Sequence, residues 1–350
     1  MSAGHGRVTW RALSGRYFGC PKGVYFAGQR LGCGVYFPRV VVTSHLPPRQ
    51  KSMESGTANL LNMLQARVRK LCEEGNWNEA MHSATAGVDK ARAALGSDLE
   101  SREALAISLE VQADFLRQYG KLEESRQAYL EALELLGETD GDHTEQKARI
   151  SASVAVVYDS DGNEEEAIRF YERGVDLFER MTPPALLDVA DLCNNLAYIY
   201  KTRGDFDEAE SLYLKALQIC HEHLGPNDEE TAAICNNVGA LYLAAGYYEQ
   251  AREMQMMALE ARRVTFGEDH VETAQSHANL ALSLCETDEL EEAKEHFVTA
   301  LSIYEKQLSE APMDYATVSS NYAEFLRAND DEKGAANIEK RAGKKLKKVS

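Results

Sequence analysis

The segment Leu192-Cys-Asn-Asn-Leu-Ala-Tyr-Ile-Tyr200 returns 42 residues later as Ile234-Cys-Asn-Asn-Val-Gly-Ala-Leu-Tyr242. Each copy is followed by a glycine and then by an alanine, at Gly204 and Ala209 in the first copy and at Gly246 and Ala251 in the second. A fixed period of this size indicates a protein built from repeats, each of which is one small unit of secondary structure.

Each unit has the pattern of two helices joined by a turn. Ala197 and Tyr200 have the spacing of residues on one side of a first helix. Gly204 ends that helix, because glycine enters a left-handed C-cap without a steric penalty. Ala209 and Tyr213 then begin the apolar stripe of a second helix. One such hairpin cannot bury its own apolar faces, so neighbouring units must stack on it.

The phase holds over seven units. The small residue near the start of the second helix recurs after 45 residues and then five times after 42, at Ala80, Ser125, Ala167, Ala209, Ala251, Ala293 and Ala335. The glycine five positions earlier recurs in five units and gives way to Asp288 and Asp330 in the last two. We therefore predict an all-α, right-handed superhelical solenoid of about seven helix-turn-helix repeats within residues 53–345. The expected repeats are 58–95, 101–136, 144–181, 188–223, 230–265, 271–308 and 316–344.

The order of residue types resembles the tetratricopeptide repeat. The small, tyrosine, glycine, alanine, aromatic and alanine positions of that family are matched by Ala197, Tyr200, Gly204, Ala209, Tyr213 and Ala216. The unit exceeds the family's usual length of about 34 residues. Cys193 and Cys235 occupy the position where the family often has tryptophan. The longer unit and the linker Leu224-Gly-Pro-Asn-Asp228 look like the kinesin light chain subtype. The resemblance implies a protein-binding solenoid and does not imply one particular reaction.

Residues 1–52 do not share the pattern. They contain eight Lys or Arg residues and no Asp or Glu, which leaves 30 basic against 56 acidic residues in the rest of the chain. This basic leader is expected to lack a stable fold, since it can bury little apolar surface. Two interpretations stand: an extension with no folded role upstream of a start at Met53, or a mitochondrial transit segment. The first, which the sequence favours, predicts a cytoplasmic protein.

The bulk composition excludes several classes of function. A chain of net charge −18 is a poor match for nucleic acid or an anionic membrane through its general field. No apolar run reaches the length of a membrane span. The seven cysteines form no CxxC pair and predict reduced thiols in a reducing compartment.

Catalytic and metal-binding patterns are not evident in the sequence. Cys220, His221 and His223 lie together, but the two histidines would point about 200° apart on a helix. Two remaining ligands do not make a zinc site. No phosphate-binding loop or nucleophile elbow occurs. The sequence therefore predicts neither an enzyme nor a bound cofactor or metal.

Asparagines recur on the first helices and predict a binding groove. At 3.6 residues per turn they point away from the small residues that pack inside each hairpin, and so toward a concave face. An amide can donate to and accept from a peptide backbone at once. In the family that the chain resembles, this asparagine contacts the ligand, a role that the resemblance carries to Asn195 and Asn237. The predicted groove residues are Asn194, Asn195, Tyr198, Lys201, Asn236, Asn237, Leu243, Asn279 and Asn321.

The groove leaves three interpretations of function. The sequence favours a scaffold that binds an extended peptide or a partner helix, with a preference for acidic residues near Lys201. The alternatives are a structural module that self-associates and an assembly factor targeted to an organelle. The asparagines could also serve as struts that bond the neighbouring repeat. The oligomeric state and the identity of the partner are left open.

Overall fold

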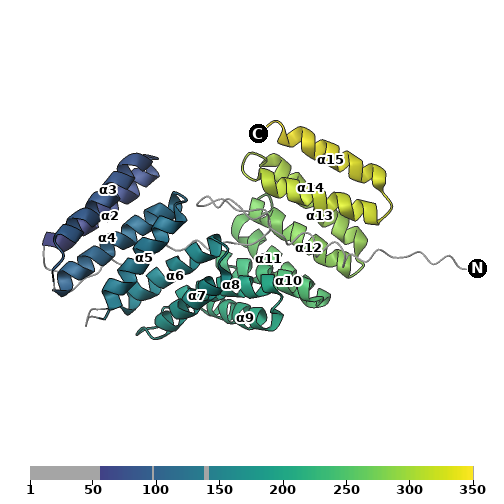
Figure 1. Ribbon diagram of the computed structural model, residues 1–350. Coiled ribbons are helices and arrows are strands. Elements are labelled where there is room, and N and C mark those ends of the chain that lie inside the picture. The colour runs from purple at the N-terminus through teal and green to yellow at the C-terminus, as the bar shows by residue number, and fades with distance from the viewer. Residues whose placement is uncertain (1–55, 97, 138–141, 350) are drawn as a thin grey trace, which may run out of the picture. The chain divides into compact units, whose positions relative to one another are not determined.

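The computed structural model describes residues 56–96, 98–137 and 142–349. The expectation of a basic leader over residues 1–52 therefore falls outside the described residues. The described ranges form fourteen α-helices and no strand (Figure 1). The predicted all-α repeat solenoid is confirmed over these residues.

The described chain divides inside one helix, between Ile199 and Tyr200, into two compact units. We call residues 56–199 the N-terminal unit and residues 200–349 the C-terminal unit. The N-terminal unit contains α2 (Gly56–Glu73), α3 (Trp77–Ala93), α4 (Leu99–Gln118), α5 (Leu122–Gly137), α6 (Thr144–Ser160), α7 (Glu164–Glu179) and most of α8 (Leu186–Arg203). The C-terminal unit contains α9 (Phe206–His223), α10 (Glu229–Ala245), α11 (Tyr248–Phe266), α12 (Val271–Glu286), α13 (Leu290–Lys306), α14 (Pro312–Ala328) and α15 (Glu332–Leu346).

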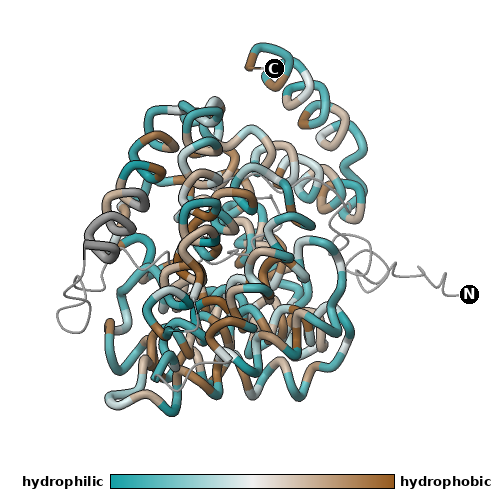
Figure 2. Tube along the Cα trace, turned by 60° about the vertical axis from the view of Figure 1, so that its left-hand side comes forward, coloured by the Kyte–Doolittle hydropathy of each residue, from teal (hydrophilic) through white to brown (hydrophobic). Residues whose placement is uncertain are grey.

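Within each unit the helices pack as consecutive hairpins. The pairs α4–α5 and α6–α7 form hairpins in the N-terminal unit, and α10–α11, α12–α13 and α14–α15 form them in the C-terminal unit. The second helix of one hairpin also contacts the first helix of the next, as α5 contacts α6 and α11 contacts α12. Hydrophobic positions recur as short segments along each helix, separated by hydrophilic ones (Figure 2). Stacking of hairpins is how such amphipathic helices bury both of their apolar sides.

The turn inside each hairpin has a left-handed residue at the predicted position. Gly204 has φ of 88° and Gly246 has φ of 85°. In the last two hairpins Asp288 and Asp330 occupy this position, with φ of 66° and 61°. Aspartate is one of the few residues with a side chain that enters this region, because its carboxylate can bond the local backbone. The turn is therefore conserved in geometry where the glycine is absent.

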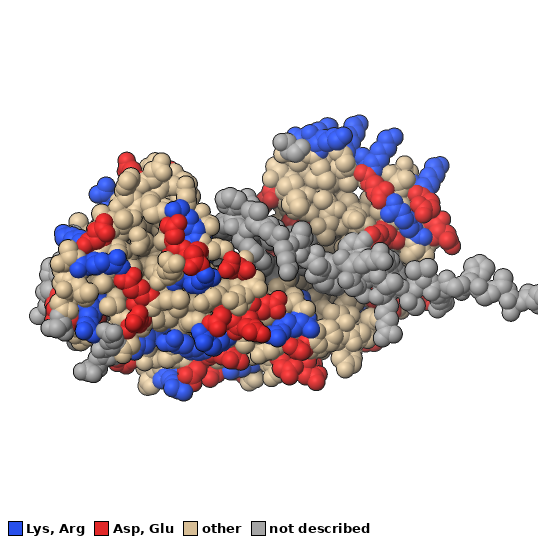
Figure 3. Space-filling model, viewed as in Figure 1, with Lys and Arg blue, Asp and Glu red and all other residues tan. Residues whose placement is uncertain are grey.

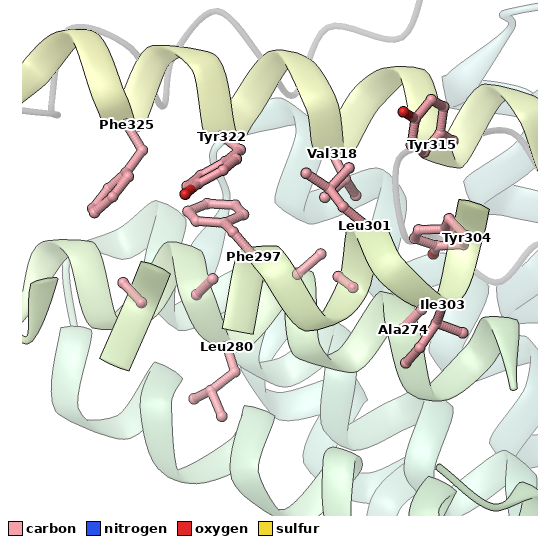
Figure 4. Packing of buried hydrophobic residues seen from close by; sticks show 14 of the residues in the cluster. Ala274, Leu280, Phe297, Leu301, Ile303, Tyr304, Tyr315, Val318, Tyr322 and Phe325 are labelled. Atoms are coloured by element: carbon pink, nitrogen blue, oxygen red, sulfur yellow. The ribbon is translucent and has the colours of Figure 1, made fainter. Parts of the chain in front are cut away.

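The repeat phase is visible in the core. The seven small residues from Ala80 to Ala335 are all fully buried, with no exposed surface. The aromatic residue of the second helix is also buried, as at Tyr129, Tyr171 and Tyr213. Figure 4 shows Phe297 of α13 pointing toward Tyr322 of α14, and their ring centroids lie 5.4 Å apart. Small residues thus allow close approach of the helices, and aromatic residues fill the space beside them.

Candidate binding surfaces on the first helices

Four of the predicted groove residues lie on α8. Asn194, Asn195 and Lys201 are buried, and Tyr198 is partly exposed. The Asn195 amide forms a side-chain hydrogen bond with Tyr171, which belongs to the preceding second helix, α7. Because α8 contains the boundary between the two units, Asn195 belongs to the N-terminal unit and Lys201 to the C-terminal unit. Asn195 therefore has an architectural contact within its own unit.

In the C-terminal unit, amides from consecutive first helices meet. Asn279 Nδ2 on α12 donates to Asn236 Oδ1 on α10 over 2.6 Å. Asn236 is buried, whereas Asn279 is partly exposed. Asn237 and Leu243 of α10 are buried as well. Asn321 lies at the corresponding position of α14 and is partly exposed. Two of the predicted groove residues, Asn236 and Asn279, thus contact each other directly between neighbouring repeats.

A buried glutamine on the second helix, which the repeat pattern does not predict, bonds the main chain at Asn236. Gln255 occupies the position of the buried aromatic residue on α11 and is 1% exposed. Its Nε2 donates to the main-chain oxygen of Asn236 over 3.2 Å. A Cβ atom at Gly239 would lie only 2.5 Å from Gln255 Nε2. Gly239 on the first helix therefore leaves the space that the Gln255 side chain of the second helix occupies. This relation can be recognised only from the structure, in which the two helices lie side by side.

The first helices α4 and α6 of the N-terminal unit are joined through the charged side chain of Glu110. Arg149 Nη2 of α6 lies 2.7 Å from Glu110 Oε1 of α4, and Gln146 Nε2 donates to Glu110 Oε2 over 3.0 Å. Tyr129 of α5 donates its hydroxyl hydrogen to Asp114 of α4. Burial raises the pKa of Glu110 and of Asp114. The sequence alone does not reveal Glu110 and Arg149, because the two residues lie in different repeats and neither type recurs at its position.

Two further buried polar clusters join helices of the C-terminal unit. Arg262 at the end of α11 pairs with Glu272 at the start of α12, with Nη2 and Oε2 3.0 Å apart. His277 of α12 and His296 of α13 place their Nδ1 atoms 2.6 Å apart. Burial, followed by the neighbouring His296, lowers the pKa of His277 to about 4. Both clusters hold consecutive helices together by polar contacts inside a largely apolar core.

No group of three or more His, Cys, Asp or Glu side chains within the described ranges has an arrangement that could hold a metal ion. Burial raises the pKa of Cys235 to about 11 and that of Cys285 to about 12. A thiol with a raised pKa is a poor nucleophile at neutral pH, because the thiolate is the reactive form. Among the described helices, none is long and apolar enough to cross a membrane.

Comparison with known proteins agrees with the repeat architecture. Residues 103–180, 188–263 and 230–306 match the family model of the tetratricopeptide repeat. BtubC (BKLC) from P. vanneervenii is 26% identical, with a TM-score of 0.57 over 65% of this chain and 90% of that one.

Two more distant structures share the fold alone. A putative kinesin light chain with nearly identical repeats from Podosopora anserina is 19% identical, with a TM-score of 0.52 over 60% of this chain and 99% of that one. The quorum sensor NprR from B. thuringiensis is 13% identical, with a TM-score of 0.53 over 82% of this chain and 87% of that one. No curated protein sequence matches the chain.

Proposed function

Since the chain belongs to the tetratricopeptide repeat family, whose members are protein-interaction scaffolds, we propose that it binds an extended peptide or a partner helix along its first helices. The proposed contacts are the predicted groove residues of each unit taken by itself: Asn194, Asn195 and Tyr198 in the N-terminal unit, and Lys201 to Asn321 in the C-terminal unit. The proposal concerns the face of the first helices that is turned away from the second helices of the same hairpins.

The contact between Asn236 and Asn279 is the observation that carries this proposal. It aligns two amides on consecutive first helices, α10 and α12. An amide side chain has two donor hydrogens and one acceptor oxygen, and the contact uses only one donor of Asn279. Asn279 is also partly exposed. Its remaining donor and its oxygen are suited to the N–H and C=O groups of an extended main chain.

The preference for acidic residues near Lys201 stays a prediction, because Lys201 is buried on α8 and already has an interaction partner. The N-terminal unit instead offers the paired charges of Glu110 and Arg149 on its first helices. Such a face favours polar ligands, because an apolar ligand would bury those charges further at a cost.

The test is selection of peptides from a random library on the immobilised protein, followed by anisotropy titration of the selected peptides. Asn279→Ala combined with Asn321→Ala should weaken binding by about 1–3 kcal/mol, because two partly exposed amides of the proposed surface are lost. Asn337→Ala is the matched control, since Asn337 is exposed on α15, away from the first helices. Thermal melts establish that each variant is folded at the temperature of the titration.

Two results would contradict the proposal. Equal affinity of the wild type and of the double variant would show that the asparagines do not contact the ligand. An equal loss in the Asn337→Ala control would show that the selected peptides bind elsewhere. In the first case, the contact between Asn236 and Asn279 would be purely a strut between repeats.

A further inference from the structure

The last helix, α15, carries a row of lysines on its outer face. At 100° per residue, Lys333, Lys340, Lys344 and Lys347 fall within about 60° of one another around the helix axis. All four are exposed, and Ala335 and Ala342, the buried residues of α15, lie on the opposite side. Lys347 and Lys348 lie just beyond the helix end at Leu346, and Lys348 is exposed as well. We call these five lysines the α15 lysine row; Figure 3 shows positive charge gathered along this helix.

The lysine row is distinct from the cations that attach α15 to the fold. Lys345 Nζ lies 2.9 Å from Glu305 Oε2 on α13, and Arg341 bonds the same carboxylate. These two cations lie on the side of α15 that faces α13. Within the described residues, by contrast, no ion pair or hydrogen bond involves the side chain of any lysine in the row. The anchoring function is thus already supplied by other residues.

The helix dipole does not account for the lysine row. Cations are favoured in the last turn of a helix, which explains Lys344 and Lys347. Lys333 lies instead in the first turn, where a positive charge is unfavourable, and Lys340 lies before the last turn. Lys340 and Lys344 are also four residues apart, and like charges at that spacing destabilise a helix. The row therefore has a cost in stability that a neutral polar face would avoid.

The solubility of the terminal repeat does not account for the lysine row either. A terminal repeat needs a polar outer face, but residues of both signs or of no charge would meet that need. The five lysines are all of one sign, in a chain with 56 acidic and 38 basic residues. An unpaired row of one sign on an otherwise acidic protein is complementary to a negatively charged partner.

We propose that the α15 lysine row is a docking site for an acidic segment of a partner polypeptide. From Lys333 to Lys347 the row is about 21 Å long at 1.5 Å per residue. An extended segment of about six or seven residues has this length at 3.3 Å per residue. Lysine ammonium groups are compact, mobile point charges, so they accept carboxylates without a fixed geometry. Recognition therefore depends on the number of acidic residues more than on their order.

The charge of the whole chain favours a short segment over a broad anionic surface. A bilayer or a nucleic acid duplex extends well beyond one helix, and places its negative charge against the rest of a chain whose net charge is −18. A short acidic segment contacts the lysine row and little else. The inference is independent of the proposed first-helix surface, because α15 is the second helix of its hairpin.

The experiment measures binding of a fluorescent oligo-glutamate peptide of about twelve residues, long enough to cover the row, to the full chain by anisotropy. Lys340→Gln, Lys344→Gln and Lys347→Gln in one variant remove three charges of the row. The matched control carries Lys90→Gln, Arg173→Gln and Lys294→Gln, which remove three exposed cations elsewhere that have no ion pair among the described residues. Wild type and control should bind alike, and the row variant roughly tenfold more weakly, as expected for three exposed ion pairs. Raising the salt from about 0.02 M to about 0.15 M should weaken wild-type binding.

Arginine at the same three positions should restore binding, since charge and not lysine itself is required. Anionic phosphatidylserine vesicles and a short DNA duplex serve as competing probes. The proposal is overturned if the row variant binds the peptide as well as the wild type does, or if the control loses as much affinity. It is also overturned if either competing probe binds the row more tightly than the peptide does. The melting temperature of the row variant, measured by circular dichroism, should be no lower than that of the wild type, because a like-charge repulsion has been removed.

Discussion

Removing the carboxylate of Glu272 should destabilise the C-terminal unit strongly. Arg262 and Glu272 are only 2% and 3% exposed, and their ion pair connects α11 to α12. Arg262 Nη1 also donates to the main-chain oxygen of Glu272 over 3.1 Å, to Gln275 Oε1 over 3.0 Å and to Ser276 Oγ over 3.1 Å. Glu272→Ala takes away the only one of these four contacts that carries a negative charge. The guanidinium is then left charged in the interior.

The expected cost is about 3–5 kcal/mol, the usual penalty when one partner of a buried ion pair is removed. Replacing both partners, with Arg262→Met and Glu272→Leu, should be close to neutral, because no charge is then buried. The chain provides a control at the next residue. Arg263 is 43% exposed and pairs with Glu268, which is 61% exposed. Glu268→Ala should cost less than about 1 kcal/mol, since water screens the exposed pair.

Urea titration followed by far-ultraviolet circular dichroism gives the free energy of unfolding of each variant. Hydrogen exchange then locates the change, which should be greatest in α11, α12 and their neighbours, because repeats couple mainly to adjacent repeats. The reasoning is refuted if Glu272→Ala costs no more than Glu268→Ala. It is also refuted if the double substitution is less stable than Glu272→Ala alone.

Three further predictions concern turns, pH and buried hydrogen bonds. Gly204→Val should cost about 2 kcal/mol in a urea titration, because a branched residue is strained at φ of 88°, whereas Asp288→Gly should cost nothing. The pKa of His277 is lowered to about 4, so the unfolded state takes up a proton first. Stability should therefore be full above about pH 6.5 and fall by about 2 kcal/mol as the pH drops toward 4. His277→Phe should abolish this part of the pH dependence in melts recorded across that range. Tyr129→Phe should lower stability by about 2 kcal/mol, because the buried Asp114 carboxyl loses a donor; a melt unchanged from the wild type would contradict this.

The sequence predicted the hairpin turns, including those without glycine. The phase of the repeat placed Asp288 and Asp330 where five other units have glycine, and both have positive φ. This succeeded because the left-handed turn is a local requirement of the backbone between two helices. The burial of Ala209 and its counterparts was predictable for a related reason: a close approach of two helices leaves room only for a small residue.

Contacts between repeats were not predictable in the same way. Gln255 stands where the phase expects an aromatic residue, and its place in the core depends on Gly239 and on the main-chain oxygen of Asn236. Glu110 and Arg149 are 39 residues apart, and neither type recurs at its position in the other repeats. Such pairs form because two helices lie close together in space. The periodicity within one helix gives no information about that distance.

The two kinds of position have different consequences for binding. Positions that recur, such as Ala209 and Gly204, are constrained by packing and by turn geometry, and Ala209 is fully buried. Positions that vary on the first helices are free of that constraint, so their chemistry differs between the units: the same repeat position holds Glu110, which forms an ion pair, in the N-terminal unit and Asn236, which forms an amide contact, in the C-terminal unit. For the proposed binding surface, we therefore expect discrimination among ligands to come from the residues that break the repeat pattern. The residues that maintain the pattern fix the interval between successive first helices, which is 42 residues for most of the chain. They therefore fix the spacing of the proposed contacts.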